Sequence, residues 1–429
     1  MKDFVPRFAV ATPYPEASIF AIARTAWRQG LLSQLFTTIS PSQRSVRTMR
    51  RLPIPPLRRS IERELSRRRS VEIPADLITN VSSSAALAHL GSIRVPLVRR
   101  ASASLEHRLR VQFDRSVSRR LPSITCDVVV TMYGSASESL RTARAAGKSG
   151  VLNFVNSHPS FKNQHLRELG NVPHGHQELV SEHEQREVSV ELEQASLVLV
   201  PSRFVARQLE AVGVASQNLV IEPYGVDLAM FGPRTSSAQP ERKSRIRCLY
   251  VGQILHRKGI PLLLDVARRL RARPIEFHLI GPLRSREVLR SLPSNVRWQD
   301  SLTAAEIAQE MRDADMLVLP SIDDAFGLVT LEAMASGLPV IVSDGAGSSE
   351  DVLDGSTGLV VRAGDRGQLE DAIERLIDDE GLRQALGSAA RRHVESGRSW
   401  TDYGRAVLDR LTEESAAVEG AGELRRAWR

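Results

Sequence analysis

The sequence predicts an α/β protein made of two doubly wound domains, in which helices cover both faces of parallel sheets. Three observations support this class. The chain has 429 residues, about three times the length of a common domain. Short β-branched runs alternate with helical patterns over most of that length. These runs are continuously apolar, as they are in strands that are buried on both faces.

Each predicted strand is a short apolar run that a helical pattern follows. The predicted strands are Phe8–Ala11, Cys126–Thr131, Val151–Val155, Leu197–Val200, Ile246–Val251, Glu276–Ile280, Val296–Trp298, Met316–Leu319 and Val340–Ser343. The predicted helices are Pro201–Val212, Ile260–Arg271, Thr303–Arg312, Gly327–Ala335, Gln368–Ile377 and Trp400–Glu414. Repeated strand–helix–strand units imply parallel sheets with right-handed crossovers.

Proline, serine and charged residues interrupt the periodicity over Gly232–Arg245. We therefore predict an N-terminal domain over residues 1–235 and a C-terminal domain over residues 245–400. A terminal helix and a frayed tail are expected over 400–429. Ligands of open α/β sheets bind beyond the carboxyl ends of the strands, so functional residues are expected in loops that face the cleft between the domains.

The net charge of +8 is distributed unevenly. Residues 44–120, within a basic segment over 41–122, include 18 arginines and 6 acidic residues. Such a stretch favours anionic partners, such as a membrane surface or a phosphorylated acceptor. The alternative interpretation is a solvated arginine face. No nucleic-acid-binding motif accompanies the charge, so nucleic acid is not expected as a partner.

The sequence also bears on the compartment. No apolar run approaches the ~18 residues that cross a bilayer, and Met1–Ala11 lacks the apolar core of a signal peptide. Cys126 and Cys248 lie in predicted strands, where buried unpaired thiols are expected. We therefore expect a cytoplasmic protein, and the arginines add the hypothesis of peripheral attachment to the inner face of the membrane.

The run from Leu317 to Ser343 contains the first candidate ligand site. A predicted strand ends in an acidic loop, and Gly327 then opens a helix. A glycine lets a ligand approach the backbone closely, and the free N–H groups of Leu328 and Val329 suit a phosphate. These residues predict an anion-binding loop.

Glu332 lies on the border of the buried face of that predicted helix. A carboxylate in such a place needs a partner, and the hydroxyls of a ligand would serve. The alternative is a carboxylate that the backbone or an arginine satisfies.

A second candidate site follows the strand that ends at Gly252. The short loop after it presents Arg257 and Lys258 directly before a helix. Adjacent cations beside a glycine turn can neutralise a diphosphate. The alternative is a solvated basic turn.

Taken together, the motifs of residues 195–412 resemble those of the retaining glycosyltransferases of family 4 (group 1 glycosyltransferases). These enzymes have the GT-B fold of two facing Rossmann-like domains. The matching stretches are PSRFVARQL, EPYGVDLAMF, VGQILHRKG, the run from Leu317 to Ser343, GSSEDVLDGSTGLVV and WTDYG. The resemblance implies transfer of a sugar from a nucleotide-diphosphate-sugar donor to a hydroxyl acceptor, such as a glycan, a lipid-linked glycan or a small molecule. It implies retention at the anomeric carbon, with no cofactor and no metal.

The resemblance also implies roles for single residues. Glu332 matches the glutamate that binds the ribose, Lys258 matches the lysine that holds the diphosphate, and Asp324 stands where a glutamate contacts the donor sugar. The loop whose backbone meets the sugar and the phosphate corresponds to Phe326, Gly327, Leu328 and Val329.

This sequence departs from the family pattern at two donor-site positions. Asp324 is shorter than the family's glutamate by one C–C bond of about 1.5 Å. Gln253 replaces the arginine that directly follows the strand glycine, Gly252, so the diphosphate is expected to rely on Lys258 with Arg257. These departures leave open a catalytically weakened nucleotide-sugar-binding protein. A sugar-nucleotide 2-epimerase or a sugar phosphorylase of the same fold is a further alternative.

The N-terminal half carries a weaker resemblance. The stretch Thr12–Phe20 has no glycine where the family has a Gly-Gly loop for the acceptor, so an atypical acceptor site is expected. His158 follows the predicted strand Val151–Val155 and resembles the family's active-site histidine, which contacts the donor sugar. The alternative is a structural histidine held by hydrogen bonds.

Five of the ten histidines lie between His158 and His183, which suggests a metal site as one hypothesis. No cysteine joins them, however, and the run Ser181–Gln194 is acidic and helical, as a solvated face would be. We therefore expect no metal site.

Overall fold

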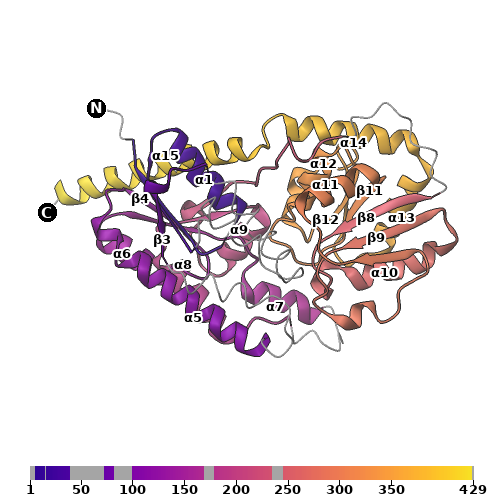
Figure 1. Ribbon diagram of the computed structural model, residues 1–429, viewed down its shortest axis with the longest axis horizontal. Coiled ribbons are helices and arrows are strands. Elements are labelled where there is room, and N and C mark those ends of the chain that lie inside the picture. Colours follow the sequence, from indigo (N-terminus) through magenta and orange to yellow (C-terminus); the bar gives the residue numbers. More distant parts are fainter. Residues whose placement is uncertain are drawn as a thin grey trace, which may run out of the picture.

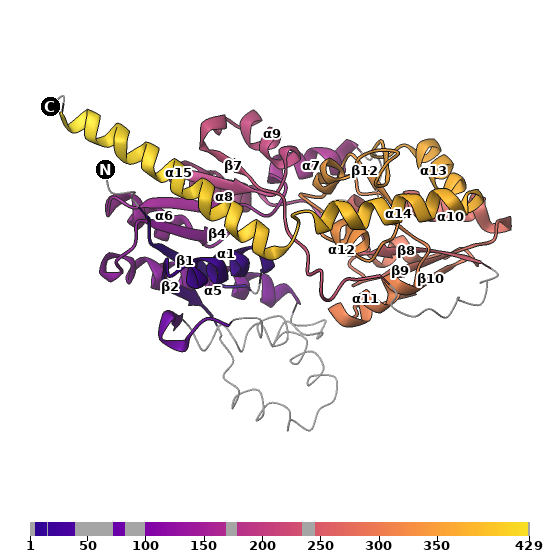
Figure 2. The same ribbon diagram turned by 90° about the horizontal axis from the view of Figure 1, so that it is seen from above.

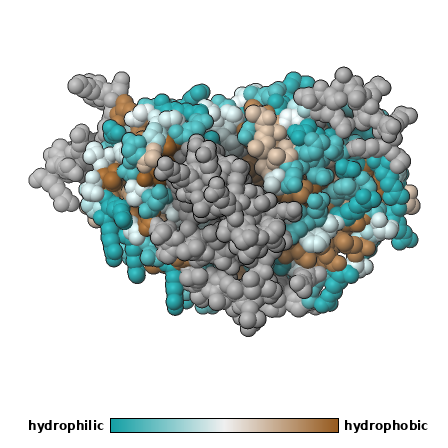
Figure 3. Space-filling view, in the orientation of Figure 1, coloured by the Kyte–Doolittle hydropathy of each residue, from teal (hydrophilic) through white to brown (hydrophobic). Residues whose placement is uncertain are grey.

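In the computed structural model, the residues described are 5–14, 16–38, 72–81, 99–168, 178–233 and 245–427. The basic residues of 39–71 and 82–98, the predicted junction over 234–244, and His174 and His176 lie outside this part of the chain. Two lobes lie side by side, the N-terminal one indigo to magenta and the C-terminal one orange (Figure 1). Hydrophilic side chains are spread over both lobes on the face seen in Figure 3.

The N-terminal lobe contains a seven-stranded sheet in the order β3-β2-β1-β4-β5-β6-β7, with every neighbouring pair parallel. Its central strands are buried on both faces because they are continuously apolar. The strands are β1 (Phe8–Thr12), β2 (Leu32–Thr37), β3 (Ile78–Asn80), β4 (Val128–Met132), β5 (Ser149–Asn153), β6 (Leu197–Val200) and β7 (Leu219–Ile221).

Six helices belong to this lobe within the described residues: α1 (Ala17–Arg28), α5 (Arg99–Ser118), α6 (Ser137–Ala145), α7 (Pro159–Glu168), α8 (Glu182–Gln194) and α9 (Arg203–Ala211). Local capping fixes two of their starts. The Ser181 hydroxyl accepts from the Glu184 amide in a capping box, and the Ser202 hydroxyl accepts from the Val205 amide. The predicted helix Pro201–Val212 is thus α9 with its cap included.

The C-terminal lobe contains a six-stranded parallel sheet in the order β10-β9-β8-β11-β12-β13. Its strands are β8 (Ile246–Val251), β9 (Ile275–Ile280), β10 (Val296–Gln299), β11 (Met316–Leu319), β12 (Val340–Ser343) and β13 (Leu359–Val361). Its helices are α10 (Ile260–Arg269), α11 (Ala304–Asp313), α12 (Val329–Ala335), α13 (Arg366–Asp378) and α14 (Glu380–Glu395).

The last helix, α15 (Trp400–Ala427), leaves the C-terminal lobe and runs along the N-terminal one, as seen from above in Figure 2. It packs closely on α1 at Gly404, where an added Cβ would lie 2.8 Å from the Ala21 carbonyl oxygen. The prediction of a terminal helix placed its start correctly at Trp400 but ended it too early, at Glu414.

The predicted fold class is confirmed: two parallel sheets with helices on their faces form the α/β, GT-B architecture. The strands β2, β3, β7 and β13 were not predicted; β3, β7 and β13 have only three residues each and carry little periodic signal. Cys126 and Cys248 are both buried and free, as predicted. None of the described helices is both long and apolar enough to cross a membrane. The domain boundaries at 235 and 245 stay a prediction.

Candidate active site

Two loops that follow neighbouring strands build the centre of the site. β8 and β11 pair in parallel, so their carboxyl ends lie at the same edge of the sheet. A single 3₁₀ turn, His256–Lys258, follows β8 and ends at Gly259. Gly259 has φ +70°, and a Cβ there would lie 1.9 Å from the Pro320 carbonyl oxygen. Glycine is therefore required, because the turn presses directly on the loop after β11.

Lys258, predicted to hold the diphosphate, is buried at this junction with 9% of its surface exposed. Its ammonium group forms an ion pair with the Asp324 carboxylate, which belongs to the loop after β11. Burial lowers the pKa of Lys258 and the nearby Arg257 adds to this effect, whereas Asp324 opposes it. The structure therefore brings two predicted site residues into direct contact.

Arg257 lies beside Lys258 and spans the two loops. Its guanidinium donates to the Asp323 carbonyl oxygen at 2.9 Å and to the Gln253 side-chain oxygen at 3.4 Å. Gln253 itself is held by the hydroxyl of Tyr250, which donates to its carbonyl oxygen. The neighbouring Gly252 lies against Gly281, where a Cβ would be 1.8 Å from the Gly252 carbonyl oxygen. Gln253 thus positions the guanidinium of Arg257 instead of presenting a cation of its own.

The predicted anion-binding loop has a tightly fixed backbone. Phe326 is buried against Tyr224, with ring centroids 4.9 Å apart. Gly327 has φ +89°, and a Cβ there would meet the Leu319 side chain at 2.6 Å. Within the described residues, the amides of Leu328 and Val329 have no recorded acceptor. Helix α12 begins at Val329, not at Gly327, and has seven residues, so its dipole is small compared with the charge of Lys258.

Glu332 lies on α12 and is partly buried. Burial raises the pKa of its carboxyl to about 7. Its side chain has no hydrogen-bond or ion-pair partner among the described residues, although its backbone N–H donates to the Leu328 carbonyl oxygen. A partly buried carboxyl group that no protein group satisfies is suited to a ligand that supplies hydroxyl donors.

His158 follows β5 at the start of α7 and is 6% exposed. Its Nδ1 accepts from the Ser160 amide at 3.3 Å, and its own amide donates to the Gln208 side chain at 2.8 Å. Burial lowers the pKa of His158 and so favours the neutral imidazole, whose Nδ1 also lies 2.7 Å from the Ser160 hydroxyl. The structural alternative is therefore partly correct, since hydrogen bonds do hold this histidine.

A cavity of about 140 Å³ lies where the two lobes meet. The C-terminal lobe contributes Arg257, Asp324 and neighbours, and the N-terminal lobe contributes the residues around His158, although His158 itself is not among the lining residues. The full lining is Tyr133, Val155, Asn156, Ser157, Pro159, Lys162, Val180, Arg257, Asp323, Asp324 and Ala325. The cleft predicted between the domains is thus a polar cavity with cations and carboxylates in its walls.

Sequence reasoning missed three N-terminal residues at this junction. Lys162 lines the cavity, and burial together with Arg257 lowers its pKa. His165 donates from Nδ1 to the Asp323 carboxylate at 2.8 Å. Glu178 accepts from the His256 amide at 3.0 Å, which ties the 3₁₀ turn to the other lobe. Lys162 is one of only five lysines, a signal that could have drawn attention to it.

The predicted histidine cluster divides into separate places. His158 and His165 lie on α7 near the cavity, and α7 lies where the lobes meet in Figure 1. His183 instead lies on α8 near His107. Among the described residues, His183 therefore belongs to a different place from His158 and His165.

Parts of this chain are similar in sequence to known proteins. Residues 233–393 match the family model described as glycosyl transferases group 1. A D-inositol 3-phosphate glycosyltransferase from Arthrobacter sp. (strain FB24) is 34% identical over 218 residues, covering 47% of this chain and 51% of that protein. The chain thus spans about half the length of the curated relatives it matches.

Two solved structures share the whole architecture. Sucrose-phosphate synthase from Thermosynechococcus elongatus superposes with a TM-score of 0.66 at 20% identity, covering 96% of this chain and 100% of that one. An Anabaena protein, HepE, solved in complex with UDP-glucose, gives a TM-score of 0.63 at 14% identity, covering 95% and 100%. The chain therefore has the GT-B fold, and its C-terminal lobe matches the group 1 glycosyltransferases.

Proposed function

We propose that this protein transfers a sugar from a nucleotide-diphosphate-sugar donor to a hydroxyl acceptor, with retention at the anomeric carbon. The observation that carries the proposal is the buried Lys258 beside Arg257 in the turn after β8, next to the loop after β11 that leads into the helix of Glu332. A nucleoside diphosphate presents the complementary groups, since its phosphates are anionic and its ribose carries hydroxyl donors.

In this proposal the charge that develops during transfer is on the departing diphosphate. Lys258 and Arg257 stabilise it electrostatically in a site with little water. Because these cations are fixed in the fold, the reaction needs no metal at the transferring atoms. Glu332 accepts from the ribose hydroxyls, and the Nε2–H of His158 donates to the sugar. Asp324, released from Lys258 when phosphate binds, contacts the sugar from the other side.

Thermal-shift measurements with UDP, GDP, ADP and dTDP identify the donor base, because a bound ligand stabilises the folded chain in proportion to its affinity and concentration. The matching nucleotide sugar is then incubated with an acceptor, and NMR of the product gives the anomeric configuration. Relatives named D-inositol 3-phosphate glycosyltransferases make D-inositol 3-phosphate the first acceptor to test. A product of inverted configuration, or no stabilisation by any nucleotide, would overturn the proposal.

One observation favours a second candidate, a nucleotide-sugar-binding protein with weakened turnover. The ammonium of Lys258 is neutralised by Asp324, and Gln253 supplies no positive charge. Tight binding of a nucleoside diphosphate without transfer to any acceptor would favour it. Conversion of the donor sugar without an acceptor would instead indicate a 2-epimerase.

We further propose that the protein works in the cytoplasm and rests on the inner face of the membrane through the arginines of residues 44–120. The support is the local excess of 18 arginines over 6 acidic residues. Arginines near an anionic surface contribute about 1 kcal/mol each at low salt. Sedimentation with liposomes that contain anionic lipid tests this, and absence of binding at ~50 mM salt would disprove it.

A further inference from the structure

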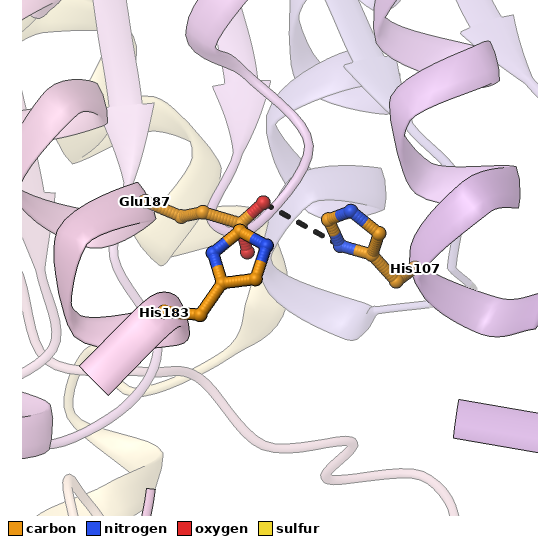
Figure 4. A group of neighbouring side chains, drawn as sticks. All are labelled: His107, His183 and Glu187. Carbon is orange, nitrogen blue, oxygen red and sulfur yellow. Dashed lines mark ion pairs between the residues drawn. The ribbon is translucent and has the colours of Figure 1, made fainter. Parts of the chain in front are cut away.

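Two helices of the N-terminal lobe bring two imidazoles and one carboxylate together outside the candidate active site. His183 and Glu187 are four residues apart on α8 and so share a face of that helix. His107 comes from α5. Figure 4 shows the three side chains converging, with one ligand atom of each within 4.8 Å of the other two.

The spacing of these atoms is close to that of a zinc site. The bonds of tetrahedral Zn²⁺ to nitrogen and oxygen are about 2.0–2.2 Å, which separates neighbouring ligand atoms by about 3.3–3.5 Å. The Nδ1 of His107 lies 3.4 Å from Oε1 of Glu187. His183 is exposed, and its ring stands edge-on to that of His107 with centroids 5.5 Å apart. The ligand atom of His183 lies within 4.8 Å of the other two, so a bound ion requires this exposed side chain to move inward.

An ordinary ion pair explains only part of the arrangement. It accounts for His107 beside Glu187, but not for the second imidazole set against the first. The charge around the cluster is mixed, because α8 carries five glutamates and one arginine, whereas α5 carries five arginines and two acidic residues. The helix is capped by Ser181 and Glu184, which form a capping box. Glu187 takes no part in this cap, so its carboxylate is not used at the helix start.

We propose that His107, His183 and Glu187 form a binding site for a divalent transition metal ion, with Zn²⁺ the best match and water as the fourth ligand. Imidazole and carboxylate are the ligands that zinc takes in sites with three protein ligands. The bound ion joins α5 to α8. None of the three residues lines the cavity between the lobes, so the site is separate from the transfer chemistry.

A metal ion bound on α8 would also affect the cavity, because α8 holds the segment that forms one cavity wall. Farther along α8, the Glu191 carboxylate accepts from the amides of Gly134 and Ala136 at 2.7 and 2.8 Å. The residue before them, Tyr133, lines the cavity. A metal ion that fixes α8 against α5 therefore steadies one wall of the cavity without touching a substrate.

Isothermal titration calorimetry with ZnCl₂ tests the proposal on the full chain, free of tags and treated with a chelator. We expect one ion per chain in the wild type and a higher melting temperature when zinc is present. His107→Ala, His183→Ala and Glu187→Gln should each weaken binding by about tenfold or more. Replacing zinc with Co²⁺ gives an independent readout, a visible absorption band typical of four-coordinate cobalt.

Glu193→Gln is the matched control, because Glu193 is an exposed glutamate on the same helix that is not part of the cluster. It should bind zinc as the wild type does. Each variant is compared by its melting temperature without metal, so that a folding defect is recognised. Absence of stoichiometric binding in the wild type would overturn the proposal. A variant that combines His107→Ala, His183→Ala and Glu187→Gln should not bind zinc. If it bound zinc as well as the wild type does, the ion would be held elsewhere and the proposal would be wrong.

Discussion

His165 Nδ1 and Asp323 Oδ2 form a hydrogen bond of 2.8 Å that connects the two lobes. His165 belongs to α7 of the N-terminal lobe, and Asp323 belongs to the loop after β11. The Asp323 side chain is 1% exposed, so the bond is shielded from solvent. The same loop carries Asp324 and borders the cavity, so this contact sets how closely the lobes meet at the site.

The first prediction concerns the pH dependence of this contact. The hydrogen bond to Asp323 raises the pKa of His165, although burial opposes it. Burial raises the pKa of Asp323, but hydrogen bonds from His165 and Ser157 outweigh it and the net shift is downward. The bond thus stabilises the folded state at pH values above the usual pKa of Asp. Its stabilising contribution is complete below pH ~6.5, the usual pKa of His. It is lost as pH rises through the raised pKa of His165.

His165→Gln should therefore lower the free energy of unfolding by about 1 kcal/mol at pH 5.5–6 and by less at pH 9. Urea unfolding at the two pH values checks this. An equal loss at both values would show that the charge of His165 does not contribute.

The second prediction is that Lys258→Ala abolishes most transferase activity while the chain stays folded. The variant removes the buried cation that we propose binds the diphosphate, and it leaves the Asp324 carboxylate without its ion-pair partner. Loss of one such electrostatic contact costs about 100- to 1,000-fold in turnover. Arg375→Ala, which removes an exposed cation of α13, should leave turnover unchanged. Steady-state assays and circular dichroism compare the two variants, and near-normal turnover of Lys258→Ala would contradict the proposed function.

The third prediction concerns the carboxyl of Glu332. Its pKa is about 7 in the folded chain, above the usual value of 4.5, so the folded state holds the proton more tightly than the unfolded state. This stabilisation is complete below ~4.5 and is lost as pH rises through about 7. Without ligand, Glu332→Gln should be more stable than the wild type at pH 8 by about 1–3 kcal/mol, with a smaller difference at pH 5. Denaturant titrations at both pH values measure this, and parallel pH profiles would refute it.

The fourth prediction tests the close approach of the turn that carries Lys258. Gly259→Ala adds a Cβ 1.9 Å from the Pro320 carbonyl oxygen at a residue with φ +70°. Gly355→Ala is the matched control, because Gly355 has the same φ but no atom within 4 Å of the added Cβ. Gly355→Ala should cost about 1 kcal/mol for the backbone conformation alone, and Gly259→Ala several times more. Thermal unfolding measures the stability of both variants. Equal losses of stability would mean that the two loops move apart at little cost in free energy.

Much of the C-terminal site could be predicted from the sequence because its determinants are local. Lys258, Asp324 and Glu332 lie close behind two apolar strands, and glycines at 259 and 327 mark the turns that place them. The sequence also shows that Gln253 departs from the family pattern. Only the structure shows what this residue does, because its side-chain oxygen accepts a hydrogen bond from Arg257.

The N-terminal contribution could not be predicted in the same way. Glu178 lies 78 residues from His256, and His165 lies 158 residues from Asp323. Nothing in the periodicity of either segment identifies the other as its partner. The neighbour of His183 could not be predicted either, because only the fold places His107 beside it.

The sequence by itself determined the α/β class, the C-terminal strands and the glycine turns that place Lys258 and Asp324, because strand burial and glycine turns depend on near neighbours along the chain. Tertiary structure alone decided which N-terminal residues close the cavity and where α15 returns to α1. These contacts depend on how two whole lobes pack against each other, and that packing is the sum of many apolar contacts between distant segments.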